Sequence, residues 1–216
     1  MDDLDSRRLT AADCYGRRFL RPGVYAYDVR AVDDASAVPA HPFVIEVGAA
    51  AADSARQHAV VIRTGGDGLV AEPATVRVQA GDFVVWQAPE VSRAFVIAGR
   101  AGCLGNDPLR DHCRYSHAFA RAGVYEWGDA NGSGLDGVVN VVAPRVACDE
   151  DRRQRVGRLR SSVLVMIRGT RAEPPEVTIE TGQRVYFAVL SSPGVTVTDV
   201  RFLTQEARAA QRATSG

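Results

Sequence analysis

Apolar and polar residues alternate with a period of two along several short stretches of the chain, and glycines separate these stretches. The segment "TVRVQAGDFVVW" at residues 75–86 alternates on both sides of a glycine turn, and "HPFVIEV" from His41 shows the same pattern. Alternation of this kind places apolar side chains on one face of a strand whose other face is polar. The pattern predicts an all-β protein of short strands joined by turns.

The predicted strands occur in two copies. The segment "AEPATVRVQAGDFVVW" begins at Ala71 and "AEPPEVTIETGQRVYF" begins at Ala172, and the two align without a gap. A second pair comprises "FLRPGVYAYDV" from Phe19 and "FARAGVYEWGD" from Phe119. Each member of that pair is followed by a further strand, "HPFVIEV" or "DGVVNVV". We call the segments that begin at Ala71 and Ala172 front halves of a domain, and those that begin at Phe19 and Phe119, with the strand that follows each, back halves. The order along the chain is therefore back half, front half, back half, front half, which indicates a tandem repeat.

The order of the halves predicts two domains of unequal continuity. Residues 57–147 contain one front and one back half and are expected to form a continuous domain. The outer halves complement each other, and a lone half would expose sheet edges and an apolar face. We therefore expect residues 1–48 and 157–216 to form a discontinuous second domain, in a circularly permuted arrangement, with 49–56 and 148–156 as linkers. If the outer halves instead pair between neighbouring chains, the protein is a self-assembling subunit.

Composition and charge exclude several classes of function. The 216 residues are 46% hydrophobic, and Lys plus Arg equals Asp plus Glu at 26 each. This balance gives no overall field that would attract nucleic acid. No apolar run approaches the ~20 residues of a membrane span. The first residues, "MDDLDSRRL", lack the features of a signal peptide, so we expect a cytoplasmic protein if the chain is full length and an exported one if a leader was removed.

Two motifs in the middle of the chain resemble the cupredoxin superfamily, which includes plastocyanin and halocyanin. The first is P-x-x-V-x-V-x-x-G-D-x-V-x-W from Pro73 to Trp86, and the second is Y-S-H-A-F-x-x-x-G-V-Y-x-W from Tyr115 to Trp127. A glycine-rich loop and "GVVNVV" from Gly137 follow. The resemblance implies a Greek-key β-sandwich for each domain, one continuous and one discontinuous.

The resemblance also implies where type 1 copper ligands would lie, and none of them is retained. Such a site uses two His, one Cys and a weak axial Met. The first His position is occupied by Ala94, the Cys position by Asp129, the second His position by Gly132 and the Met position by Leu135. The corresponding positions identified in the second domain are occupied by Val195, Val29 and Ala40. We therefore expect no copper and no other cofactor.

A different cluster keeps a metal centre open as an alternative. The stretch "DHCRYSH" brings His112, Cys113 and His117 close together in sequence, with Cys103 ten residues before Cys113. Thiolate and imidazole ligands suit copper or zinc, so this set could serve a metal-binding or electron-transfer protein. The other interpretation is a disulfide between Cys103 and Cys113 that closes the loop, which would need an oxidising compartment.

The glycine-rich loop after Trp127 is the candidate binding loop. It carries Asp129, Asn131, Ser133 and Asp136, and loops at the end of a sandwich are where such folds usually bind. The sequence has no G-x-S-x-G elbow, no phosphate-binding loop and no H-E-x-x-H pair, so we expect no catalytic residue. The sequence therefore predicts a non-enzymatic structural or protein-binding protein whose partner is another protein or a second copy of itself.

Overall fold

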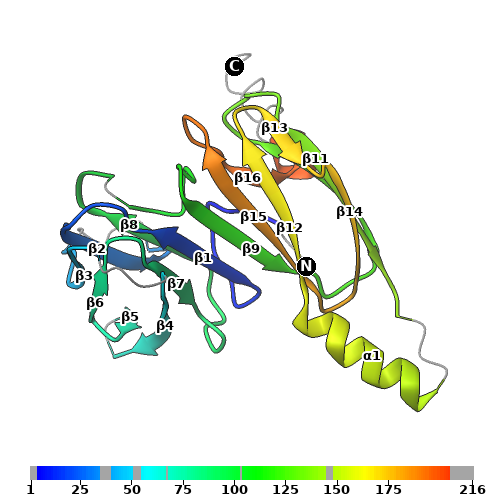
Figure 1. Cartoon of the computed structure of the whole chain (residues 1–216), viewed down its shortest axis with the longest axis horizontal. Helices are drawn as coiled ribbons and strands as arrows, with labels where there is room; N and C mark the ends of the chain where they lie inside the picture. The colour runs from blue at the N-terminus through cyan, green and yellow to red at the C-terminus, as the bar shows by residue number, and fades with distance from the viewer. Residues whose placement is uncertain are drawn as a thin grey trace.

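The computed structural model describes residues 4–34, 40–50, 55–66, 68–102, 104–144 and 148–204 (Figure 1). Strands dominate these residues, and the prediction of an all-β protein is confirmed. The helical elements are α1 (Asp149–Arg160), the short 3-10 turn η1 (Arg100–Gly102) and a helical turn at 200–204. Among the described residues, no helix has the length and apolarity needed to cross a bilayer.

One large sheet runs through the whole molecule. Its eight strands are, in spatial order, β13 (Arg171–Glu173), β12 (Ser162–Arg168), β15 (Arg184–Ser191), β9 (Cys113–Ala118), β1 (Asp13–Arg18), β7 (Phe83–Gln87), β4 (Gln57–Gly65) and β5 (Gly68–Glu72). Strands β9 and β1 lie at its centre, so the two halves of the chain meet in an unbroken backbone hydrogen-bond network (Figure 1).

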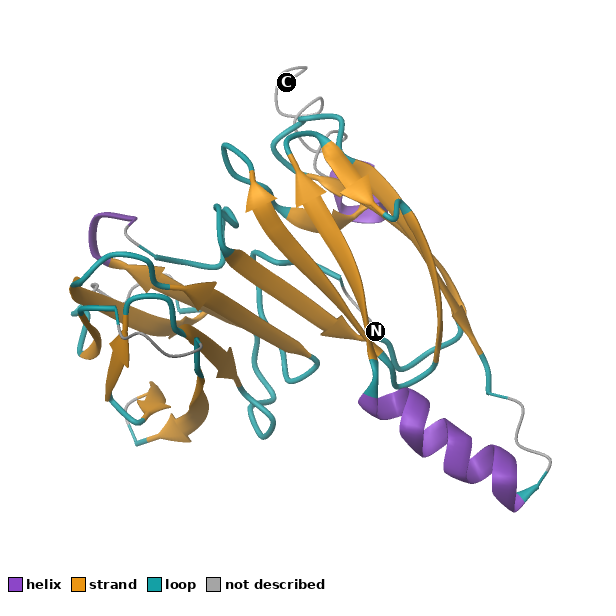
Figure 2. Ribbon diagram, viewed as in Figure 1, coloured by secondary structure: helices purple, strands orange, loops and turns teal. Residues whose placement is uncertain are grey.

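Two smaller sheets each pack on one half of the large sheet (Figure 2). The first contains β6 (Thr75–Gln79), β3 (Phe43–Gly48), β2 (Gly23–Ala31) and β8 (Phe95–Gly99), and the second contains β14 (Glu176–Glu180), β11 (Asp136–Val142), β10 (Gly123–Asp129) and β16 (Val197–Asp199). The rings of Tyr27 on β2 and Trp86 on β7 are 5.6 Å apart, and those of Trp127 on β10 and Phe187 on β15 are 5.0 Å apart. Each half of the molecule is therefore a two-layered β-sandwich around an aromatic core.

The predicted division into domains is wrong. Strand β7 pairs with β1, β6 with β3 and β8 with β2, so the front half within 57–99 completes the back half within 13–48. In the same way β15 pairs with β9, β14 with β11 and β16 with β10. Residues 57–147 therefore do not form a domain, and residues 1–48 do not pair with 157–216 as a sandwich. The two copies of each half have nearly the same pattern, so alternation alone could not choose between them, and the shorter connection costs less loop entropy.

The same pairings remove the reason for expecting assembly between complementary halves. Each described back half already has a front half of the same chain beside it. The sheet edges that the sequence prediction left open are therefore paired internally.

The segment 148–156, expected to be a linker, forms most of helix α1. The Cys148 amide donates to Asp151 Oδ2 at 3.2 Å at the start of the helix, and Gln154 Nε2 donates to Glu150 Oε1 at 3.2 Å one turn apart. Acidic residues at the beginning and arginines in the last turn also suit the helix dipole. Figure 1 shows that α1 protrudes from the sandwiches. This helix was not predicted from the sequence.

The two sandwiches are related by an approximate two-fold axis at the centre of the large sheet. Tyr15 and Tyr115 lie directly opposite each other in the antiparallel pair of β1 and β9. Equivalent backbone hydrogen bonds flank them: the Arg18 amide donates to His112 O and the Ala118 amide to Ala12 O, each at 3.0 Å. In the segments around β1 and β9, a residue of the first copy is therefore matched to the residue one hundred positions later.

The segments before β1 and β9 each cross from one sandwich to the other. Asp5 bridges to Thr198 in the second sandwich, whereas Leu9 bridges to Phe95 in the first. The equivalent residues do the reverse, since Gly105 bridges to Ala98 and Leu109 to Val195. The halves of the molecule are thus joined by a reciprocal exchange of segments as well as by β1 and β9.

A buried amide ties the two crossing segments together. Asn106 Nδ2 donates to Ser6 O at 2.7 Å, and Asn106 Oδ1 accepts from the Ile97 amide at 2.7 Å. Ser6 and Asn106 are equivalent residues of the two copies, and both are almost fully buried. These hydrogen bonds therefore hold the two crossing segments together where the sandwiches meet.

Candidate functional site

The Cys/His cluster proposed from the sequence does not assemble. His117 is buried with its Nδ1 2.7 Å from Asp13 Oδ1, whereas Cys113 Sγ lies 3.4 Å from Tyr15 Oη and His112 is exposed. Across the described part of the chain, no three His, Cys, Asp or Glu side chains form a group that could hold a metal ion. Four residues along a strand span about 13 Å, which separates Cys113 from His117.

The predicted disulfide has no support in the structure. Cys113 is a free cysteine, as are Cys14 and Cys148, and Cys103 lies outside the described residues. Burial raises the pKa of the Cys14 thiol above its ordinary value, with Arg184 acting in the opposite direction. Cys113 is buried, Cys14 is half-buried and Cys148 is exposed, and the three are free thiols.

The candidate binding loop uses its polar atoms to hold its own shape. Asp129 is buried, and its Oδ1 accepts from the Thr196 amide at 2.8 Å and from the Asn131 amide at 3.1 Å. Ser133 Oγ accepts from the Leu135 amide at 3.3 Å, and Asp136 is exposed at the start of β11. Asp129 therefore fixes one end of the second sandwich, beside the segment that contains Val195 and not beside Ala94.

A buried polar cluster lies at the junction of the two sandwiches. The carboxylate of Asp13 accepts from the Thr10 amide at 2.7 Å, from Thr10 Oγ1 at 2.6 Å and from Tyr115 Oη at 2.7 Å, with His117 Nδ1 at 2.7 Å. Asp13 has no exposed surface. Burial, together with the nearby Asp13 charge, raises the pKa of Tyr115 well above its ordinary value. These contacts link the first sandwich to the second, so this cluster is structural.

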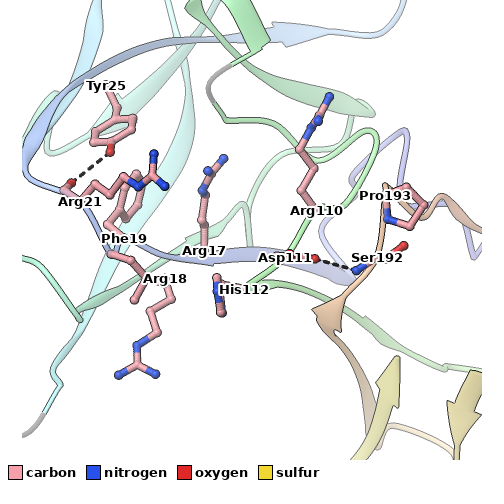
Figure 3. Close-up of a pocket in the computed structure, with 11 residues that line it drawn as sticks. Arg17, Arg18, Phe19, Arg21, Tyr25, Arg110, Asp111, His112, Ser192 and Pro193 are labelled. Atoms are coloured by element: carbon pink, nitrogen blue, oxygen red, sulfur yellow. Dashed lines mark hydrogen bonds between the residues drawn. The ribbon is translucent and has the colours of Figure 1, made fainter. Parts of the chain in front are cut away.

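A pocket of about 740 Å³ opens next to this junction, and its wall is rich in arginine (Figure 3). We refer to it as the arginine pocket. Its lining residues are Arg17, Arg18, Phe19, Leu20, Arg21, Tyr25, Arg110, Asp111, His112, Ser192 and Pro193. They come from β1 and the turn after it, from β2, from the turn before β9 and from the loop after β15. Both sandwiches therefore contribute to the pocket.

The alternation of strand β1 sends its last two arginines to opposite sides. Figure 3 shows the guanidinium groups of Arg17, Arg21 and Arg110 on one side of β1, with Arg18 and His112 on the other. Arg17 lies 5.7 Å from the centre of the Phe19 ring, and Arg18 Nε donates to Gly81 O at 2.8 Å. The pocket therefore has a cationic wall on one side and a cationic rim on the other.

The pocket wall also contains one acidic residue. Asp111 lines the pocket, but its Oδ1 accepts from the Ser192 amide at 2.6 Å. Arg21 and Arg110 form no salt bridge with any carboxylate in the described parts of the chain. Guanidinium groups hold carboxylate or phosphate through two parallel hydrogen bonds, so the pocket is suited to an anion.

The second copy of the repeat shows that the fold does not need these charges. The residues equivalent to Arg17, Arg18, Arg21, Arg110 and His112 are His117, Ala118, Arg121, Thr10 and Ala12. Tyr25 Oη donates to Arg21 O at 3.0 Å and Tyr125 Oη donates to Arg121 O at 2.9 Å, so the local backbone is the same in both copies. In the second copy arginine is retained at only one of these positions, Arg121.

Sequence reasoning missed the arginine pocket because the whole chain is neutral and the arginines are divided between two segments. The signal was nevertheless present, since "GRRFLR" and "LRDH" each contain charged residues that their repeats "SHAFAR" and "LTAA" lack. Comparisons with protein-family models, curated proteins and solved structures gave no match. The geometry of the pocket is therefore the basis for a functional assignment.

Proposed function

We propose that this protein is a non-enzymatic binding protein that captures an acidic segment of another protein in the arginine pocket. In this proposal its two sandwiches are cupredoxin-like Greek-key domains that have lost their type 1 copper ligands. The observation that carries the proposal is the one-sided placement of Arg17, Arg21 and Arg110, whose equivalents are His117, Arg121 and Thr10.

Two features favour an acidic protein segment over a long nucleic acid. The chain has equal numbers of basic and acidic residues, so it has no overall positive charge that would attract a long polyanion. Exposed apolar groups, Leu20 at 48% and the neighbouring Pro193, also line the arginine pocket. A polypeptide with several carboxylates can satisfy the arginines and cover this apolar surface together.

The test is binding of a fluorescein-labelled oligoglutamate peptide to the full chain, followed by fluorescence anisotropy. Arg21→Ala and Arg110→Ala are each expected to weaken binding by about tenfold, because each removes one charge-assisted interaction of about 1.5 kcal/mol. Added salt should weaken wild-type binding, because the site is open to solvent.

Arg121→Ala is the matched control, since Arg121 is the equivalent of Arg21 and lies outside the arginine pocket. It should bind the peptide as the wild type does. The proposal fails if the peptide does not bind at low salt, or if Arg121→Ala weakens binding as much as Arg21→Ala. Tighter binding of an oligothymidylate of equal charge would assign the pocket to nucleic acid instead.

A further inference from the structure

A second pocket lies directly beside the arginine pocket, on the outer face of the large sheet. It has a volume of about 390 Å³, and we refer to it as the outer pocket. Its apolar wall includes Phe83 on β7 and Ala188 and Leu190 on β15. Arg18 and His112 line both pockets, so the two are contiguous at the ends of strands β1 and β9.

The aromatic wall of the outer pocket is held in place by its neighbours. A side chain at Gly16 would clash with the Phe83 ring, so the absence of one lets the ring lie over β1. The guanidinium of Arg114 lies 4.8 Å from the centre of the Phe83 ring and 5.3 Å from that of Tyr186. The Arg114 guanidinium thus contacts both rings and helps to hold the Phe83 ring in place.

The boundary between the pockets is also rigid. His112 has a φ of 64°, a left-handed conformation that is uncommon for a residue other than glycine. Its carbonyl accepts from the Arg18 amide at 3.0 Å, and its amide donates to Val189 O at 2.9 Å. Strained backbone of this kind persists where the surrounding structure fixes it, often at binding sites.

The two pockets together restrict the kind of ligand that could occupy them. Figure 3 shows that Arg18 and His112 lie on the opposite side of β1 from Arg17, Arg21 and Arg110. A ligand that reaches both pockets must therefore pass around the turn at residues 110–112. An extended polypeptide can do this, with carboxylates on one side and an apolar side chain on the other, whereas a compact anion would occupy the arginine pocket alone.

We propose that the segment recognised by this protein carries an aromatic or large aliphatic side chain next to its carboxylates, and that this side chain enters the outer pocket against Phe83 and Leu190. This inference rests on the proposed function, because the carboxylates of the same segment occupy the arginine pocket. The apolar side chain supplies selectivity among acidic segments, which charge alone does not provide.

The test compares labelled oligoglutamate peptides in which one central glutamate is replaced by Phe or by Gln, each titrated with the full chain. The Phe peptide should bind about tenfold more tightly than the Gln peptide, because it buries an aromatic ring at equal charge. Leu190→Ser should remove most of this difference. Leu164→Ser is the matched control, because Leu164 is a similarly exposed leucine on the adjacent strand β12 outside the outer pocket.

The outcomes separate the two proposals. If Arg21→Ala still weakens binding but the Phe and Gln peptides bind equally, the outer pocket is not used and the proposed function stands. If no acidic peptide binds, both proposals fail. A photoreactive benzoylphenylalanine at the Phe position gives a second readout that needs no variant. Cross-links at residues 188–190 are expected. Cross-links confined to β12 and β13, at the edge of the large sheet, would overturn the assignment.

Discussion

Replacing Asp13 with alanine is the sharpest test of how the two sandwiches are held together. The change removes a fully buried carboxylate that accepts from the Thr10 amide, from Thr10 Oγ1 and from Tyr115 Oη, with His117 within hydrogen-bond distance. Tyr115 and His117, which lose this partner, are both buried. Breaking a buried charged network in this way costs about 3–5 kcal/mol, which is a large part of the stability of a typical domain.

The repeat supplies the control for this experiment. Cys113 is the residue equivalent to Asp13, and its Sγ lies 3.4 Å from Tyr15 Oη. Cys113→Ala loses one weak contact and creates a small cavity, so it should cost about 1 kcal/mol. The difference between the two variants therefore measures the charged network and not the position in the fold.

Urea unfolding followed by tryptophan fluorescence measures both variants. Trp86 and Trp127 are buried in different sandwiches, so the signal reports on each half of the molecule. Because Asp13 links the halves, Asp13→Ala should also broaden or split the transition, whereas Cys113→Ala should leave a single transition. If the free energies of unfolding of the two variants differ by less than about 1 kcal/mol, the network does not hold the halves together as inferred.

Three further predictions concern ionisation and the crossing segments. Burial opposes ionisation of Asp82, but hydrogen bonds from the backbone and from His58 lower its pKa from 3.8 to about 2. The stability that this carboxylate contributes above pH 3.8 should therefore be lost as the pH falls toward 2. Asp82→Asn should flatten this part of an acid-unfolding curve. Asn106→Ala should lower the free energy of unfolding by about 2 kcal/mol in urea, whereas Ser6→Ala should be nearly neutral because Ser6 Oγ has no hydrogen-bond partner among the described residues. Burial raises the pKa of three tyrosines. The stability that they contribute is therefore complete below pH 10 and lost at higher pH. An absorbance titration should show their tyrosinate forming only as the protein unfolds. These tyrosines are Tyr15, Tyr27, whose pKa burial raises to about 12, and Tyr115.

Period-two alternation predicted the strands well because it reports directly on which face of a strand is buried. The two predicted front-half segments became β6 with β7 and β14 with β15, and the turn glycines Gly81 and Gly182 separate them. Pairing between strands was not predictable in the same way. The two back halves have nearly the same pattern of apolar positions. This pattern therefore could not tell which back half pairs with a given front half. The crossing segments at residues 4–9 and 104–109 carry short, weakly patterned stretches, so their exchange left no periodic signal.

The candidate site was predicted less well than the fold, since a pocket depends on residues that are distant in sequence. Cys113 and His117 looked like a metal set because they are close in sequence, yet an extended strand separates them and other partners take their polar atoms. Arg17 and Arg110 are far apart in sequence, and only the antiparallel pairing of β1 with β9 brings their segments together. Local motifs therefore favoured the wrong cluster.

Comparison of the two copies separates residues that the fold requires from residues that it does not. Phe19 and Tyr25 form an edge-on pair 5.0 Å apart, and Phe119 and Tyr125 repeat it at 4.9 Å, so packing accounts for these aromatic residues in both copies. The arginine pocket has no such account, because the second copy builds the same turn with threonine and alanine in place of Arg110 and its neighbours. Like charges that gather in one pocket oppose one another. The proposed function accounts for this difference between the copies, because the fold does not require these arginines and an anionic segment would offset their repulsion.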